Sequence, residues 1–175
     1  MKILILQGSP TNGHTKALCA SFIESLADCH EVKQVDVAKK NIHGCLGCDM
    51  CKQTPNVCVQ QDDMIGLLQK ISGAECLVFA SPIYFAGITS QLKAVLDRCH
   101  CLEKDRMQNK KTVLLFTSGS VDETVIAPAL AMFDKLQEHF HWTMLGLVHG
   151  PGVHRASDVL NVSVLAKAQA LGQSL

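Results

Sequence analysis

The sequence predicts an α/β fold built on a doubly wound, five-stranded parallel sheet with helices on both faces. Short apolar runs recur along the chain, and each is followed by a turn signal and then by a segment with apolar residues at helical spacing. The expected strands are 2–7, 32–37, 76–81, 112–118 and 144–150, and the expected helices are 15–26, 62–71, 89–101, 125–140 and 156–171.

Length, charge and cysteine content limit what the chain can be. A chain of 175 residues with no repeat, linker or low-complexity tract is expected to form one domain over 1–175. The Lys and Arg residues balance the Asp and Glu residues at 16 each, so neither nucleic acid nor a membrane surface is an expected partner. The start, MKILILQGSP, has too short an apolar run for a signal peptide, so a cytoplasmic protein is expected. The odd number of cysteines, 9, favours reduced thiols, metal ligation or redox work over a disulfide framework.

The first expected strand runs into a loop of small residues, GSPTNGHT, which ends where a helix begins. Gly8 and Gly13 permit tight turns, and hydroxyl, amide and imidazole groups surround the positive end of the helix, an arrangement that favours binding of one phosphate group. The loop lacks the Gly-Lys-Ser/Thr ending of a P-loop and the glycine spacing of the dinucleotide fingerprint. A plain strand-to-helix turn capped by Thr15 is the alternative. The candidate residues are Ser9, Thr11, Asn12, Gly13, His14 and Thr15.

Two more loops are expected at the same edge of the sheet, because the carboxyl ends of parallel strands meet there. In SPIYFAG, Pro82 stiffens the backbone, and the apolar residues after it suit a flat wall against a planar ring system. Tyr84 or Phe85 could instead pack in the core or at a subunit contact. The loop TSGS offers small donors for the edge of a heterocycle. The candidate residues in the two loops are Ser81, Pro82, Ile83, Tyr84, Phe85, Thr117, Ser118 and Gly119.

The longest interruption of the pattern, residues 38–61, carries four clustered cysteines, GCLGCDMCKQTPNVC. A structureless loop of that length in a compact domain is usually functional or held by something. Thiolates at two-residue gaps can surround one small metal centre. The candidate ligands are Cys45, Cys48, Cys51 and Cys58.

Taken in order, KILILQGSPTNGHT, GCLGCDMCKQTPNVCVQQDDM, ASPIYFAGITSQLKAVLDR and TSGS resemble the flavodoxin-like NAD(P)H-dependent FMN reductases, in the iron-sulfur flavoprotein branch or its cluster-less relatives. The resemblance implies a flavodoxin-like sheet of strand order 2-1-3-4-5 that binds FMN. By this resemblance Ser9, His14 and Thr15 would hold the phosphate with help from the backbone of Asn12 and Gly13. Residues 82–85 would line the isoalloxazine and ribityl groups, and 117–119 would meet the pyrimidine edge. The family often has a basic residue at the position of Thr11 or Asn12, and its absence here leaves the phosphate charge to the helix dipole and His14.

The same resemblance makes the four clustered cysteines candidate ligands of a [4Fe-4S] cluster, which would lie about a loop's length from the flavin and relay single electrons. Related reductases also carry Cys-rich segments that serve only as a loop, so vacant thiols are an alternative. Zinc or a disulfide are further alternatives, although structural zinc sites commonly use two separated Cys pairs.

The leading functional hypothesis is an oxidoreductase in which NAD(P)H, a transient co-substrate, reduces bound FMN, and a quinone, a flavin or a similar small-molecule or redox-protein acceptor takes the electrons. The chemistry would be flavin-centred, so no catalytic side chain is predicted. The alternatives are an iron-sulfur flavoprotein electron carrier and a non-enzymatic, redox-sensing flavin module.

Three further expectations concern residues outside these loops. A homodimer or homotetramer is favoured by apolar surface on Tyr84, Phe85, Trp142 and the Cys-rich segment, residues 38–61. Asp97 and Arg98 are expected to form a structural ion pair. His149 and His154 follow the fifth strand near the same edge, where a lone histidine is more often a solvated or capping group than a catalyst.

Overall fold

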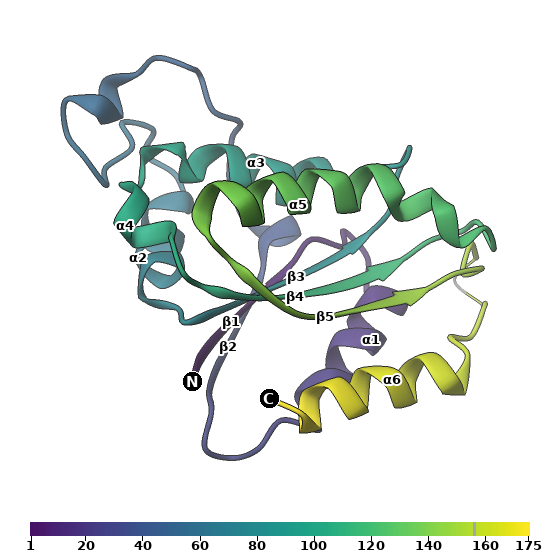
Figure 1. Cartoon of the computed structure of the whole chain (residues 1–175). Helices are drawn as coiled ribbons and strands as arrows, with labels where there is room; N and C mark the ends of the chain where they lie inside the picture. Colours follow the sequence, from purple (N-terminus) through teal and green to yellow (C-terminus); the bar gives the residue numbers. More distant parts are fainter. Residues whose placement is uncertain (156) are drawn as a thin grey trace.

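The computed structural model describes residues 1–155 and 157–175, and it contains a five-stranded parallel sheet of order β2-β1-β3-β4-β5 (Figure 1). The fold class and strand order expected from the sequence are therefore confirmed. The strands are β1 Lys2–Gln7, β2 Glu31–Asp36, β3 Cys76–Pro82, β4 Lys111–Thr117 and β5 Thr143–Gly150. The α-helices are α1 His14–Ile23, α2 Met64–Gly73, α3 Ser90–Arg98, α4 Lys104–Met107, α5 Ala127–Phe140 and α6 Val162–Gln173. Short 3-10 turns are η1 Val37–Lys39, η2 Met50–Lys52, η3 Cys99–Cys101 and η4 Glu123–Ile126.

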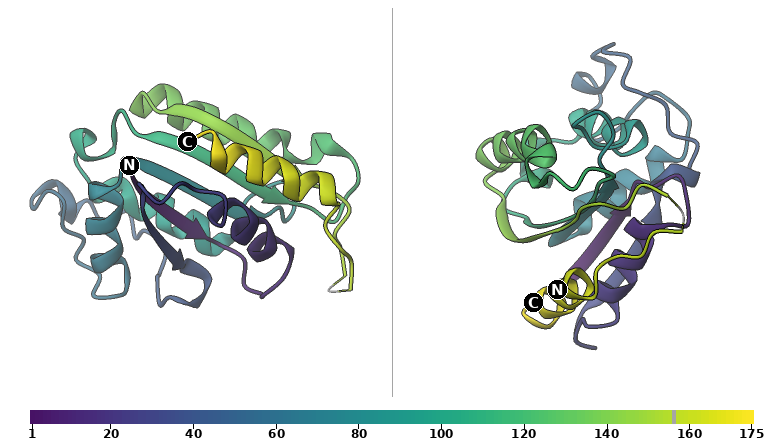
Figure 2. Two further views of the ribbon diagram at one scale, coloured as in Figure 1. Left: turned by 90° about the horizontal axis from the view of Figure 1, so that it is seen from below. Right: turned by 90° about the vertical axis from the view of Figure 1, so that its right-hand side faces the viewer.

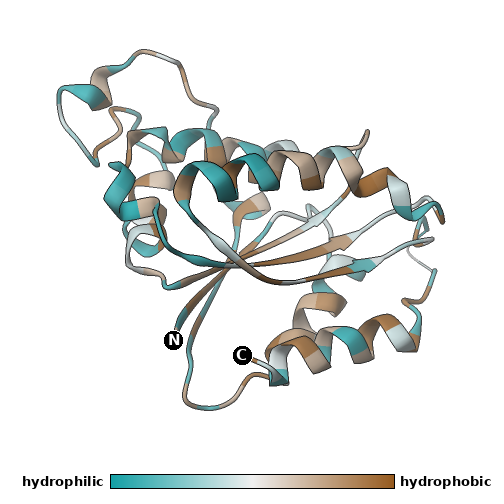
Figure 3. Cartoon of the chain, viewed as in Figure 1, coloured by the Kyte–Doolittle hydropathy of each residue, from teal (hydrophilic) through white to brown (hydrophobic). Residues whose placement is uncertain are grey.

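The sheet is the middle layer between two layers of helices (Figure 2). Helices α1 and α6 cover one face, and α2, α3, α4 and α5 cover the other. Alternate side chains of a strand point to opposite faces, so Leu4 and Leu6 of β1 pack on the second face while Ile3 and Ile5 pack beneath α1 and α6. Burial on both faces explains why the central strands are continuous apolar runs (Figure 3).

Several helix boundaries differ from those expected. The last helix begins at Val162 rather than at 156, because the Asn161 side chain accepts a hydrogen bond from the Ser163 N–H (2.9 Å) and caps the helix there. Residue 156 itself lies outside the described residues. The helix expected over 89–101 ends at Arg98 and continues as the turn η3. Helix α4 was not expected, since four residues are too few to show a periodic pattern.

Trp142 is buried, so the expectation that it adds apolar surface is wrong. Its indole packs beside Phe79 and Phe140, and its Nε1–H donates to the Met107 carbonyl. A buried indole usually finds such an acceptor, and here the bond joins α4 to the start of β5. None of the helices in the described ranges has the length and apolar composition needed to cross a membrane.

Candidate cofactor site

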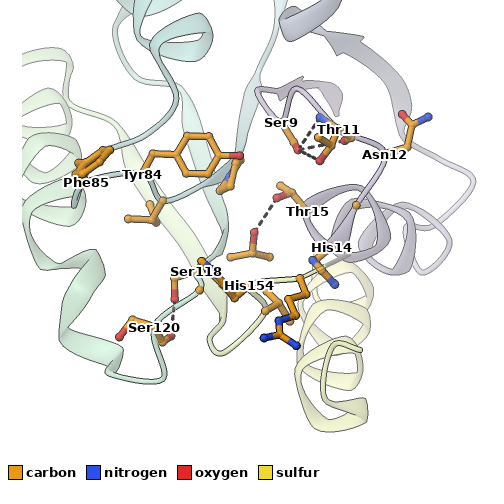
Figure 4. A pocket seen from close by; sticks show the side chains of 17 residues that line it. Ser9, Thr11, Asn12, His14, Thr15, Tyr84, Phe85, Ser118, Ser120 and His154 are labelled. Carbon is orange, nitrogen blue, oxygen red and sulfur yellow. Dashed lines mark hydrogen bonds between the residues drawn. The ribbon is translucent and has the colours of Figure 1, made fainter. Parts of the chain in front are cut away.

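The carboxyl ends of β1, β3 and β4 meet at one edge of the sheet. β1 continues into α1 on one face and β3 into α3 on the other, so the chain diverges here as it does at the switch point of a doubly wound sheet. All of the residues predicted to bind a cofactor, except Ser81, line a single cavity of about 640 Å³ at this edge (Figure 4). That volume is in the range of small-molecule sites.

The first loop is fixed against the sheet at Gly8. Its N–H donates to the Ala80 carbonyl (2.8 Å), and its carbonyl accepts from the Thr89 hydroxyl (2.9 Å). A Cβ at position 8 would lie 2.8 Å from the Cβ of Leu92, closer than side chains tolerate. Glycine therefore allows the end of β1 and the start of α3 to approach each other.

The amino end of α1 opens on the cavity without a capping side chain. Within the described residues, the backbone N–H groups of Asn12, Gly13, His14 and Thr15 have no protein acceptor. Free N–H groups at the positive end of a helix form a site for an anion. Thr15 lies inside the helix and does not cap it, because its hydroxyl is hydrogen bonded to that of Thr117 (2.7 Å). The alternative of a turn capped by Thr15 is therefore wrong.

The other polar groups of the first loop are held by short-range hydrogen bonds. Ser9 is 3 % exposed; its N–H donates to Gln7 Oε1 (3.1 Å) and its hydroxyl to the Thr11 carbonyl (3.1 Å). The Asn12 side-chain oxygen accepts from Lys16 Nζ (2.7 Å). These bonds set the loop shape before any ligand binds, so little ordering is needed on binding.

The loop after β3 is a tight hairpin. Tyr84 and Gly87 exchange both backbone hydrogen bonds (2.8 and 3.0 Å), and the two residues at its tip, Phe85 and Ala86, have φ of 49° and 65°. This is the pattern of a type I′ turn, which normally takes Asn or Gly at these positions. The Tyr84 ring extends towards the first loop, whereas Phe85 points away and is fully exposed (Figure 4). Ile83 is mostly buried in the core, so the expected flat wall is formed chiefly by Tyr84.

Ser81 does not line the cavity. It is completely buried, its hydroxyl donates to the Pro82 carbonyl (2.7 Å), and the same oxygen accepts from the Thr89 N–H (3.0 Å). Thr89 in turn caps α3 by accepting from the Leu92 N–H. Ser81 therefore supports the turn between β3 and α3 from beneath.

Ser118 in the loop after β4 is part of a short polar chain. Its hydroxyl donates to the Ser120 carbonyl (3.0 Å) and lies 2.8 Å from His149 Nε2. Burial lowers the pKa of His149, against a smaller opposite effect of Glu123. The lowered pKa favours the neutral imidazole, which is hydrogen bonded to Ser118, a residue that lines the cavity.

Sequence reasoning left four lining residues out of the candidate set: Ser120, Val153, His154 and Arg155. A Cβ at Gly119 would lie 2.7 Å from His154 Nδ1, so His154 packs directly on that backbone. Asp158 Oδ2 accepts from the N–H groups of His154 (2.7 Å) and Arg155 (2.5 Å), which lower its pKa. The Asp158 carbonyl is bonded to His14 Nε2 (2.6 Å), so this segment folds onto the first loop. The sequence signal for these residues is HGPGVHR, at the end of the fifth strand. The first loop has no Lys or Arg, and this segment brings basic side chains to the same cavity.

The four clustered cysteines line a separate, very small cavity of about 20 Å³ together with Arg98 and Cys101. Four thiols around one space are a suitable donor set for an iron-sulfur cluster. They do not converge as ligands of a single metal ion, since no group of three or more His, Cys, Asp or Glu in the described ranges is so placed.

The Cys-rich segment lies at the opposite end of the sheet from the carboxyl ends of β1, β3 and β4 (Figures 1 and 2), and the cofactor cavity is at those carboxyl ends. It packs on the last turn of α3, which runs back from the switch point, and the Asn56 N–H donates to the Cys101 carbonyl (2.9 Å). The expectation that the thiols lie about a loop's length from the cofactor site is therefore wrong for a single chain.

Arg98 pairs with Asp62, not with Asp97 as expected. The pair is bidentate, with Nη1–Oδ2 and Nη2–Oδ1 distances of 2.7 and 2.9 Å, and both side chains are buried. Burial opposes ionisation of Asp62, but the guanidinium and the N–H groups of His43 and Met64 outweigh it and lower its pKa to about 2. Asp97 instead forms an exposed pair with Lys93 (2.7 Å).

The fold and the cavity define a flavodoxin-like protein with a candidate site for a phosphorylated cofactor. The chain belongs to the NADPH-dependent FMN reductase family, whose family model matches residues 1–150. The resemblance seen in the sequence is thereby confirmed.

Several similar proteins among the curated ones are named iron-sulfur flavoproteins, and another, from Bacillus subtilis, is named a putative NAD(P)H-dependent FMN-containing oxidoreductase. One from Methanocaldococcus jannaschii is 34% identical over 100 residues, which are 56% of this chain and 51% of that protein. One from Archaeoglobus fulgidus is 30% identical over 122 residues, 68% of this chain and 60% of that protein. The chain thus spans about half the length of the first relative and somewhat more of the second.

Solved structures show the same fold. The NAD(P)H:quinone oxidoreductase from Methanothermobacter marburgensis superposes with a TM-score of 0.79 at 17% identity, covering 99% of this chain and 95% of that chain. Smu.1420 from Streptococcus mutans superposes with a TM-score of 0.81 at 16% identity, covering 100% of both chains. At such identities the likeness extends to the fold alone.

Proposed function

We propose that the protein is an FMN-dependent NAD(P)H oxidoreductase that passes electrons from a nicotinamide through bound FMN to a quinone, a flavin or a similar acceptor. The observation that carries this proposal is the cavity at the switch point, where free backbone N–H groups, hydroxyls and the Tyr84 ring come together. Membership in the FMN reductase family supports the same cofactor.

The cavity fits the two ends of FMN. The free N–H groups at the start of α1 suit a phosphate, and the cationic or imidazole side chains that line the cavity are His14, His154 and Arg155. No carboxylate of the described residues lines it. The Tyr84 ring and the Thr117–Gly119 backbone offer an apolar surface and hydrogen-bonding groups to a flat heterocycle.

When bound, FMN supplies the redox chemistry, taking a hydride from the nicotinamide and giving electrons to the acceptor. The residues of the chain bind and orient it. Ser9 and Thr15 are buried and fixed by hydrogen bonds, so they hold the first loop, GSPTNGHT, in one shape. Tyr84 is half exposed, which leaves the cavity mouth open for nicotinamide and acceptor to bind in turn.

A second candidate is an iron-sulfur flavoprotein that carries electrons through a [4Fe-4S] cluster. Two observations favour it: all four clustered cysteines line one small cavity, and several of the curated relatives are named iron-sulfur flavoproteins. Cys45, Cys48, Cys51 and Cys58 would hold the cluster, which would supply one-electron transfer.

The remaining features of the proposal rest on the sequence and family. We propose a single flavodoxin-like FMN-binding domain over 1–175, a cytoplasmic location, and a homodimer or homotetramer that binds neither nucleic acid nor membranes. The balanced charge, 16 basic against 16 acidic residues, supports the proposal that the protein binds neither nucleic acid nor membranes.

The proposal is tested by anaerobic reduction. Purified protein should contain FMN, and NADPH or NADH should bleach the bound flavin rapidly. The double variant Ser9→Ala/Thr15→Ala should lose FMN while its circular dichroism keeps the native α/β spectrum. Full FMN content in that variant contradicts the assigned phosphate site. Bound FMN that neither nucleotide reduces indicates the non-enzymatic flavin module instead.

A further inference from the structure

A second large cavity, of about 630 Å³, lies beside the Cys-rich segment and is nearly as large as the cofactor cavity. One side is formed by α2, and the other by residues 56–58 together with the chain entering α4. No residue lines both this cavity and the cofactor cavity. The proposed oxidoreductase mechanism does not use it, and of the four proposed cluster ligands Cys58 alone is among its lining residues.

Hydrogen bonds fix the shape of this second cavity. The Asn56 N–H donates to the Cys101 carbonyl (2.9 Å), and the Asn56 side-chain N–H donates to Glu103 Oε2 (2.8 Å). The Glu103 N–H returns a bond to Asn56 Oδ1 (2.9 Å). Residues 56–58 are therefore tied to the start of α4, and the cavity wall they form is a built surface rather than a loose loop.

The lining combines apolar walls with one positive charge. Val57 and Ile65 remain 51% and 40% exposed, although both are large apolar residues. Arg106 is the one charged residue among the described lining residues. The nearest carboxylate oxygen, on Asp105, lies 3.9 Å from its Nε, too far for a hydrogen bond. A guanidinium suits the planar geometry of a carboxylate and is only weakly hydrated.

We propose that this cavity is a binding site for a small organic anion with an apolar body. Arg106 receives the anionic group, and Val57, Ile65 and Leu68 contact the apolar part. Cys58 lines both this cavity and the small cysteine cavity, so the bound anion lies directly against the Cys-rich segment. The site is independent of FMN binding, because it shares no lining residue with the cofactor cavity.

The test uses naphthoate as the probe and naphthamide, its neutral counterpart of similar shape, as the control ligand. Equilibrium dialysis is performed on full-length protein saturated with FMN. Naphthoate should bind more tightly than naphthamide. Arg106→Ala should weaken naphthoate binding about tenfold or more, the effect of losing a charged hydrogen bond. Lys104→Ala, which removes a positive charge from α4 outside the lining, should leave it unchanged.

A second variant fills the space. Ile65→Trp should block binding of both probes, and since Ile65 is partly exposed the variant should fold with an unchanged FMN content. Equal naphthoate affinity in wild type and Arg106→Ala overturns the proposal. So does binding that excess FMN displaces, binding that survives Ile65→Trp, or the absence of binding because this face is covered by a second copy of the chain.

Discussion

At the scale of single residues, Arg155 supplies the cofactor cavity with a charge that the first loop lacks. The loop GSPTNGHT has no Lys or Arg, yet Arg155 lines the same cavity as the free N–H groups of α1. We expect Arg155→Ala to weaken FMN binding about tenfold or more, because a hydrogen bond to a charged group contributes about 1.5–3 kcal/mol. Riboflavin, which lacks the phosphate, should bind with unchanged affinity.

Flavin fluorescence titrations measure both affinities. Lys167→Ala is the matched control, since it removes one exposed positive charge from α6 and Lys167 does not line the cavity. Equal losses of FMN and riboflavin affinity would show that Arg155 acts on the shape of the cavity and not on the phosphate. No loss for either ligand would remove Arg155 from the site.

At the scale of elements, the Asp62–Arg98 pair closes the base of the Cys-rich segment. Asp62 accepts N–H bonds from His43 (3.1 Å) and from Met64 (3.0 Å), and Arg98 donates to the His43 carbonyl (3.0 Å). The pair therefore ties the beginning of the segment to its end and to α3. It is a structural clamp, and it explains how a long interruption is held without regular structure.

The clamp predicts an acid dependence of stability. The pKa of Asp62 is lowered to about 2 in the folded chain from an ordinary 3.8. Its contribution is thus fully present above about pH 4 and is lost as the pH falls towards 2. Asp62→Asn should lower the free energy of unfolding at neutral pH by about 3 kcal/mol, because Arg98 stays buried without a partner. The variant should also lose part of the acid dependence.

Urea unfolding at several pH values measures both effects. Asp97→Asn, which breaks an exposed pair with Lys93, should change the free energy of unfolding by less than about 1 kcal/mol. If the two variants behave alike, the buried pair is not a clamp.

The same segment predicts a result for iron. If the clustered cysteines hold a [4Fe-4S] cluster, anaerobic reconstitution should give about four irons per chain and broad visible absorption that dithionite bleaches. Cys48→Ser should abolish both while FMN content is unchanged, because no residue of the segment lines the cofactor cavity. Cys29→Ser is the control, since that exposed cysteine lies outside the segment. Iron near zero after reconstitution would leave the thiols without a cluster.

The elements show why some features could be predicted from the sequence and others could not. The strands and the loops at their carboxyl ends are local patterns, and doubly wound topology brings those loops together, so Ser9, Thr15 and Thr117 were placed at one cavity. Arg98 has a carboxylate neighbour in the sequence, Asp97, but on a helix adjacent residues point in different directions and the true partner lies 36 residues away. Trp142 is buried beside Phe79 and Phe140, and its indole N–H finds an acceptor on Met107 of α4, a helix too short to detect from a periodic pattern.

At the scale of the whole molecule, the hairpin after β3 is the best candidate for a contact between copies. Phe85 is fully exposed at its tip, and both Phe85 and Ala86 have positive φ, which costs on the order of 1 kcal/mol for each such residue. Strain that exposes a large apolar side chain beside a cofactor cavity is explained if the ring is buried against another copy. Val121, Val159 and Val162 are also exposed, but none of the three has a positive φ.

Phe85→Gly separates association from folding because it moves the two in opposite directions. Glycine adopts positive φ freely, so the variant should unfold at the same or a higher temperature when measured at dilution. Loss of the buried ring should weaken dimer or tetramer formation about tenfold or more, since a fully buried Phe side chain contributes about 1.5–3 kcal/mol. Sedimentation across micromolar concentrations measures the assembly, with Val162→Ala as the control. Wild-type protein that is monomeric throughout, or a Phe85→Gly variant that associates as wild type does, would show that this hairpin does not join copies of the chain.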